Sequence, residues 1–118
     1  MVAVVRIFAG QRAWLLQRAS ALVLLLFLLL GSTILVLGPP LTYSRWHALA
    51  TSAHGTVLIV VFFAALSAHG WVGARDIVLD YIHPPAWRLA VLALIAVVLF
   101  AVQIRVLLTI AAQVTTAG

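Results

Sequence analysis

The chain has 118 residues, of which 66% are hydrophobic and 8% are charged, whereas a soluble domain carries about 25% charged residues. Its net charge of +5 comes from arginines scattered singly between apolar runs rather than gathered in a basic stripe. This composition excludes a soluble globular domain and argues against a nucleic-acid partner, and the absence of cysteine excludes disulfides and thiolate metal sites.

The first apolar run, Ala19–Gly38, contains no charged residue and ends at Pro39-Pro40. At ~1.5 Å per residue, about 20 helical residues match a hydrocarbon core of roughly 30 Å. The run is longer than the apolar part of a cleaved signal peptide, and no small-residue cleavage site follows it. We therefore predict a membrane-spanning helix over about residues 14–38.

Two further apolar runs follow. The second, Trp46–Ala74, is uncharged if its histidines are neutral, and it predicts a helix over about 46–76. The third begins after Pro84-Pro85 and predicts a helix over about 86–114. Because lipid cannot satisfy open backbone groups, all three spans are expected to be α-helical. The fold class is therefore an all-α membrane protein with three transmembrane helices in one domain over 1–118.

The arginines predict the orientation. Three crossings place the N-terminus and the second connection on one side, and this side has five arginines against one in the first connection. We therefore expect the N-terminus to be cytoplasmic. The five are Arg6, Arg12, Arg18, Arg75 and Arg88, and the one is Arg45.

Polar side chains inside the predicted spans indicate partner subunits. Three helices form little interior of their own, yet the second span contains His54 and His69 and the third contains Arg105. Intramembrane polar groups usually face a partner, a cavity or a cofactor. Arg105 is assigned no chemistry, because its long side chain can reach toward an aqueous interface.

The second span contains the tetrapeptide Ser-Ala-His-Gly twice, at 52–55 and at 67–70. The two histidines would lie ~60° apart around the helix and ~22 Å apart along it. A neutral imidazole is the axial haem ligand of membrane cytochromes b, and the adjacent glycine allows close approach. Alternatively, the histidines bond to a neighbouring helix. The pattern alone does not choose between His54 and His69.

Asp80 and Tyr81 follow 11 and 12 residues after His69, about 16–18 Å along a continuing helix. A tyrosine hydroxyl can donate to a quinone carbonyl, and a nearby carboxylate can orient it or deliver protons. The alternative is an interfacial anchor beside a solvated aspartate. Arg18 is suited to pairing with a haem propionate, or it serves only as a cytoplasmic-side anchor.

These residues carry a family resemblance. His69-Gly70-Trp71-Val72-Gly73 followed by Asp80-Tyr81 resembles the H-x-x-x-G…D-Y pattern of the small hydrophobic membrane-anchor chain of succinate dehydrogenase (complex II). Gln17-Arg18-Ala19-Ser20-Ala21 is similar to the opening of that family's first helix. The resemblance covers most of the chain, and its specific part is residues 69–81.

The resemblance implies a four-subunit enzyme of the tricarboxylic acid cycle. The Ala/Val/Leu-rich composition, with arginine as the only basic residue besides histidine, suggests a bacterial inner membrane, and a mature mitochondrial chain is the alternative. This chain, non-catalytic alone, would join a second membrane anchor (a cytochrome b556-type subunit), an iron–sulfur subunit and a flavoprotein subunit. His69 would be an axial ligand of the haem b iron, shared with the second anchor, and Arg18 would lie near the propionates. Tyr81 and Asp80 would form part of the ubiquinone site.

Other assignments stay open. His54 has no counterpart in the family pattern, so it is structural or marks a second haem, and His83 either assists proton movement or is a loop residue. The alternatives are a menaquinol-using fumarate reductase anchor, a cytochrome b subunit of another dehydrogenase, or a cofactor-free membrane scaffold. The sequence does not determine the reaction direction or the quinone.

Overall fold

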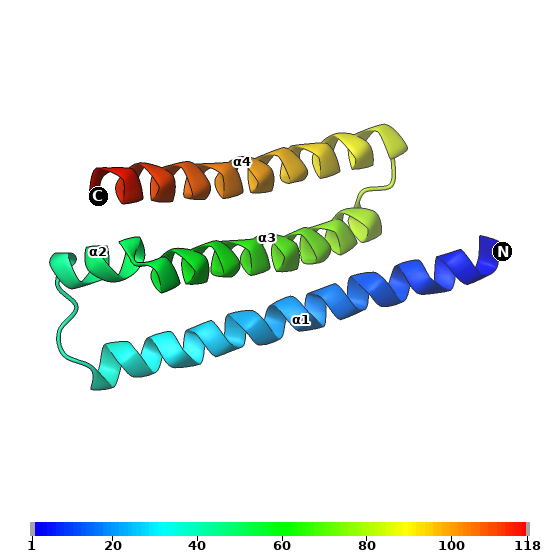
Figure 1. The fold of residues 1–118 in the computed structure, drawn as a ribbon. Coiled ribbons are helices and arrows are strands. Elements are labelled where there is room, and N and C mark those ends of the chain that lie inside the picture. Colours follow the sequence, from blue (N-terminus) through cyan, green and yellow to red (C-terminus); the bar gives the residue numbers. More distant parts are fainter. Residues whose placement is uncertain (1, 118) are drawn as a thin grey trace.

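The computed structural model describes residues 2–117, with side chains over 10–116. It contains four helices and, over residues 2–117, no strand (Figure 1). The helices are α1 (Val2–Leu37), α2 (Tyr43–Thr51), α3 (Ala53–Tyr81) and α4 (Pro85–Ala117). The predicted all-α fold class is therefore confirmed.

Three of the helices are long and apolar enough to cross a membrane. The candidate spans are Gly10–Leu37, Ala53–Tyr81 and Pro85–Thr116. This confirms the three transmembrane helices expected from the hydropathy pattern. α1 and α4 are longer than the predicted apolar runs, because residues at the ends of a span continue the helix into the interfacial region, whereas α3 begins and ends later in the chain than predicted.

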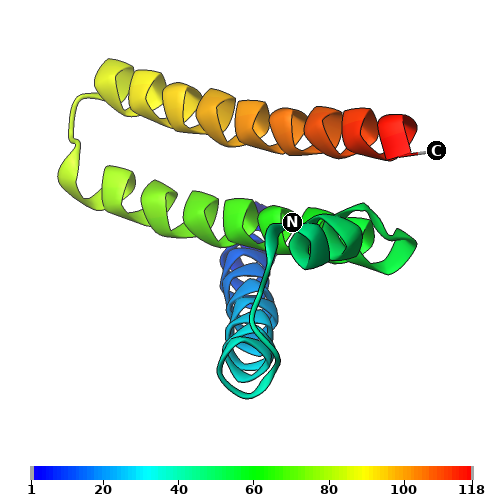
Figure 2. The ribbon, with the colours of Figure 1, turned by 90° about the vertical axis from the view of Figure 1, so that its left-hand side faces the viewer.

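The helices lie in a row with α3 in the middle (Figures 1 and 2). α3 contacts α1 on one side and α4 on the other, whereas α1 and α4 do not meet within the described residues. The short α2 contacts both α3 and α4. The α3–α4 turn lies at the same end as the start of α1, and the C-terminal end of α4 lies beside α2 (Figure 1).

Little of the surface is buried within the chain. Val72 and Val78, both on α3, are the buried apolar side chains among residues 10–116. Most large apolar side chains of α1 and α4 are exposed. No residue in the most apolar stretch of α4 is buried within the chain. In a membrane protein these surfaces face lipid or other subunits, so the helices are not held together by a conventional core.

The structure differs from the predicted single helix over 46–76, because the chain breaks at Ser52. Its ψ of 155° is extended, and the residue closes α2 and opens α3. Its hydroxyl donates to the Leu49 carbonyl (2.7 Å) and accepts from the Gly55 amide (3.0 Å). A serine side chain that bonds neighbouring backbone groups competes with continuous helix and favours an N-cap.

Gly55 permits the close approach at this break. A Cβ added there would overlap the Leu49 carbonyl oxygen and lie 2.9 Å from Ser52 Oγ. The absence of a side chain is therefore a steric requirement of the α2–α3 junction.

The α3–α4 turn is held by one arginine. Arg88 donates from Nε to the Ile82 carbonyl (2.9 Å) and from Nη2 to the Leu79 carbonyl (3.2 Å). These carbonyls belong to the last turn of α3 and its C-cap, where backbone acceptors lack helical partners. Pro85 begins α4, the position where a missing amide hydrogen is best tolerated.

Candidate functional site

The middle of the α1–α3 interface contains a histidine in contact with a buried serine. His69 lies in the central part of α3 and is half-buried. Its Nδ1 lies 3.3 Å from Oγ of Ser20 on α1. Ser20 is 5% exposed, and its hydroxyl also donates to the Gln17 carbonyl at 3.0 Å. The pair connects the first two spans through polar atoms inside an apolar surface.

Small side chains allow the two helices to approach here. Gly73, one turn after His69, faces Gln17 of α1: an added Cβ would lie 3.8 Å from Gln17 Nε2. Small residues at helix contacts allow close backbone packing in membranes. Gly70, adjacent to His69, has nothing within 4 Å of an added Cβ. The surface beside the histidine is therefore open on that side.

The two copies of Ser-Ala-His-Gly have different surroundings. In the first copy, Ser52 and Gly55 form the α2–α3 break, and His54 is exposed in the first turn of α3. In the second copy, His69 lies inside a continuous helix and contacts α1. The internal repeat is thus a helix cap in one place and part of a helix–helix contact in the other.

Asp80 and Tyr81 form the last turn of α3, and both are exposed. Because α3 continues to Tyr81, Asp80 lies ~16 Å along the axis from His69 and ~20° around it, on nearly the same face. Tyr81 lies ~18 Å along and ~120° around. The tyrosine is 79% exposed, which leaves its hydroxyl available to a group outside this chain.

The structure does not bring Arg18 to His69. Arg18 lies two positions before Ser20, a turn of ~200° around the axis, so the two side chains point to nearly opposite sides of α1. The guanidinium lies 5.5 Å from the centre of the Trp14 ring, a cation–π arrangement, and the side chain is exposed. Arg18 and Trp14 therefore form a separate feature on the outer face of α1.

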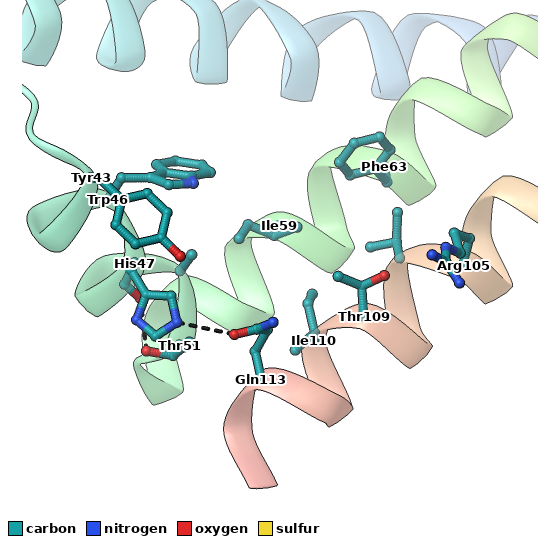
Figure 3. A pocket seen from close by; sticks show the side chains of 12 residues that line it. Tyr43, Trp46, His47, Thr51, Ile59, Phe63, Arg105, Thr109, Ile110 and Gln113 are labelled. Carbon is teal, nitrogen blue, oxygen red and sulfur yellow. Dashed lines mark hydrogen bonds between the residues drawn. The ribbon is translucent and has the colours of Figure 1, made fainter. Parts of the chain in front are cut away.

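A groove between α2, α3 and α4 lies at the opposite end of the molecule from Tyr81. Side chains from all three helices line it (Figure 3). Its volume is about 360 Å³. His47 Nε2 and Gln113 Oε1 lie 3.1 Å apart across it, which joins α2 to the last turns of α4. Arg105 is one of its lining residues. The sequence gives no signal for the His47–Gln113 contact, because the partners are 66 positions apart.

A second groove, about 410 Å³, runs between α3 and α4. Gln103 lines it, and its Oε1 is buried without a hydrogen-bond partner among the described residues. Ser67 and Trp71 line the same groove from α3. The groove is shallow and mostly apolar, with Ser67 and Gln103 among its few polar lining residues.

The donor set fits a single axial ligand rather than a metal cage. Over the side chains of residues 10–116, no three His, Cys, Asp or Glu residues gather as metal ligands do. His69 offers one imidazole with Nδ1 engaged by Ser20, and Nε2 has no hydrogen-bond partner within that range. An axial haem ligand has this form: one nitrogen free and the other hydrogen-bonded.

Sequence reasoning missed Ser20 as a site residue. It belongs to the Gln17–Ala21 segment that carried part of the resemblance, yet only Arg18 of that segment was assigned a role. A serine within an apolar span is a weak signal alone, because its hydroxyl can bond its own helix, as Ser20 does with Gln17. Only the packing of α1 on α3 shows its second contact.

Three apolar helices in a row, with a histidine in their middle span, define this protein as an all-α multi-pass membrane protein. Within that class, residues 3–104 match the family described as Succinate dehydrogenase/Fumarate reductase transmembrane subunit. The chain belongs to this family and is a membrane anchor subunit.

A curated relative supports the assignment. The chain is 28% identical over 90 residues to a succinate dehydrogenase hydrophobic membrane anchor subunit from Coxiella burnetii (strain RSA 493 / Nine Mile phase I). The aligned region covers 76% of this chain and 78% of the relative. The similarity therefore extends over most of the chain rather than over one motif.

Proposed function

We propose that this chain is a haem b-binding, quinone-site-forming anchor of succinate:quinone oxidoreductase. It holds the flavoprotein and iron–sulfur subunits at a bacterial inner membrane and shares the haem with a second, cytochrome b556-type anchor. The observation that carries the proposal is the His69–Ser20 pair, which leaves one imidazole nitrogen available in the middle of a span. Family membership supplies the enzyme class.

His69 is the proposed axial ligand, through Nε2. Its position on α3, half-buried against α1, limits rotation of the ring. Haem b bound there supplies a one-electron carrier within the membrane. The second ligand must come from the companion anchor, because His54 lies in the first turn of α3 and is directed outward. A second haem at His54 has no structural support beyond the repeated tetrapeptide.

Tyr81 and Asp80 are the proposed contribution to the ubiquinone pocket. Tyr81 donates a hydrogen bond to a quinone carbonyl, and Asp80 orients that contact or delivers protons to it. Both side chains are exposed. They lie at the end of α3 whose last carbonyls accept hydrogen bonds from Arg88. The rest of the pocket belongs to the companion anchor and the iron–sulfur subunit.

The proposed orientation places the N-terminus and the α3–α4 turn in the cytoplasm. Five arginines lie toward that side of the membrane in the sequence. Tyr81 then faces the compartment that contains the iron–sulfur subunit. Arg18 is proposed to lie near the haem propionates; within this chain it lies beside Trp14, on the side of α1 away from Ser20.

Fumarate reductase is the second candidate, because the family description covers both enzymes. The anchor alone does not set the direction of electron flow. Assays of the purified complex with succinate and ubiquinone, and with fumarate and menaquinol, separate the two.

A paired substitution tests the haem assignment. In the purified four-subunit complex, we expect His69→Ala to abolish or strongly reduce the b-type bands of the reduced-minus-oxidised spectrum, because the iron loses an axial ligand. His54→Ala is the matched control from the other tetrapeptide, and it should leave the bands intact. The reverse order would move the ligand to His54, and a wild-type complex without b-type bands would leave a cofactor-free scaffold.

A further inference from the structure

The hydroxyl of Ser20 has two neighbours and only one proton. It lies 3.0 Å from the Gln17 carbonyl oxygen and 3.3 Å from His69 Nδ1. It is also 5% exposed, the one buried polar side chain among residues 10–116. In such a low-dielectric position, each polar contact has a large effect on the groups that make it.

The proton count selects one arrangement. A carbonyl oxygen can only accept, so the contact with Gln17 requires the hydroxyl proton. If that proton instead pointed to His69, the hydroxyl and carbonyl oxygens would face each other with lone pairs at 3.0 Å. Both contacts are satisfied together only when the imidazole carries its proton on Nδ1 and donates it to Ser20 Oγ.

We propose that Ser20 is a positioning residue that holds His69 in the Nδ1–H tautomer, with the Nε2 lone pair directed away from α1 for axial ligation. This inference rests on the proposed haem role of His69. A neutral histidine has two tautomers, and only the one with an unprotonated Nε2 can ligate through that atom. Ser20 thus prepares the ligand before any cofactor arrives.

The same contact tunes the ligand once it is bound. A histidine that donates its second N–H to an acceptor becomes a more basic ligand, and loss of such a partner typically costs about 10–100-fold in metal affinity. A more basic ligand favours the ferric over the ferrous iron, so Ser20 lowers the reduction potential of the haem. A tenfold loss of that preference equals a rise of about 59 mV for a one-electron couple.

The test uses the complete four-subunit complex with substitutions at residue 20. We expect Ser20→Ala to raise the haem midpoint potential, to lower the haem-to-protein ratio and to change the ferric electron paramagnetic resonance signal, because the ring loses its orientation. Ser20→Thr, which keeps a hydroxyl, should restore all three. Ser67→Ala, in the second tetrapeptide but on the α3–α4 groove, is the matched control and should behave as wild type.

An isosteric pair separates the hydroxyl from packing. Thr and Val at residue 20 have nearly the same volume, so a Ser20→Thr complex with wild-type potential and a Ser20→Val complex with a raised one would support the inference. If the Ser20→Ala complex fails to assemble, this comparison still tests whether the hydroxyl acts on His69. Equal potentials and equal resonance signals in the Thr and Val complexes would overturn it.

The outcomes distinguish this inference from the function on which it rests. Bands that depend on His69 but do not respond to any hydroxyl-removing substitution at residue 20 would reject the tautomer role and leave the haem role intact. Bands that survive His69→Ala would reject both.

Discussion

Tyr81 is an exposed residue of the proposed site, with 79% of its surface accessible. It ends α3, and its side chain is turned ~120° from His69 around the helix axis. The same helix therefore directs the two side chains differently. The imidazole contacts α1, whereas the phenol points away from the other helices of this chain. His69 and Tyr81 are therefore suited to binding two different groups, the proposed haem and the proposed quinone, rather than the same one.

We expect Tyr81→Phe to lower quinone reduction by the complex roughly 2- to 10-fold, the effect of losing one hydrogen bond. Succinate oxidation with an artificial dye acceptor should be unchanged, because the proposed role of Tyr81 is confined to the quinone. The two activities measured on one preparation check this. Tyr43→Phe, at a similarly exposed tyrosine at the other end of the molecule, is the control. Equal loss of both activities would contradict a quinone contact at Tyr81.

At this scale the sequence predicts the ligand candidate but not its partner. A histidine inside an apolar span is a recognisable candidate because intramembrane polar groups usually face a partner, a cavity or a cofactor, and the family resemblance selects His69 over His54. Ser20 is 49 positions away, and a serine in a helix can satisfy itself locally. Its role depends on how α1 packs on α3. Both helices are apolar on all sides, so the sequence does not indicate which face of each helix contacts the other.

At the scale of elements, the α2–α3 break is the feature that hydropathy does not predict. Trp46–Ala74 is continuously apolar or neutral, and an apolar run gives no indication of where a helix is interrupted. The interruption comes from Ser52 bonding the backbone on both sides, while the same tetrapeptide at 67–70 stays helical. Local sequence is identical in the two places, so the surrounding chain decides.

Gly55→Ala tests the break. The added Cβ would overlap the Leu49 carbonyl oxygen, so we expect a destabilisation of about 1–3 kcal/mol, typical of overpacking. The measurement is the thermal midpoint of the complex in detergent. Gly31→Ala is the control: it lies inside α1 with nothing within 4 Å, and it should leave the midpoint unchanged or slightly higher. Equal midpoints for the two variants would show that the junction is not tightly packed.

For the whole molecule, the number of spans follows directly from hydropathy, because the hydrocarbon core requires a fixed length of apolar helix. The side-by-side order, with α3 between α1 and α4, does not. A soluble protein reveals its inner faces through alternating polar and apolar residues, whereas here lipid and subunit contacts are both apolar. Only the few polar or small residues, such as Ser20 and Gly73, mark where helices meet.

The orientation is testable because the chain has no cysteine of its own. We expect a single cysteine at Ala86→Cys, in the first turn of α4, to be shielded from a membrane-impermeant thiol reagent in intact cells. Leu41→Cys, in the α1–α2 connection, should be labelled. Both positions are exposed in this chain, and labelling after membrane disruption provides the accessibility control. The opposite pattern would invert the topology.

The contact between α1 and α3 also has a consequence for biosynthesis. Ser20 and His69 belong to the two candidate spans that precede α4 in the chain, and α4 does not lie between them. The pair can therefore form while the third span is still being translated. An imidazole already oriented at that stage would be available as the proposed ligand before insertion of the chain is complete.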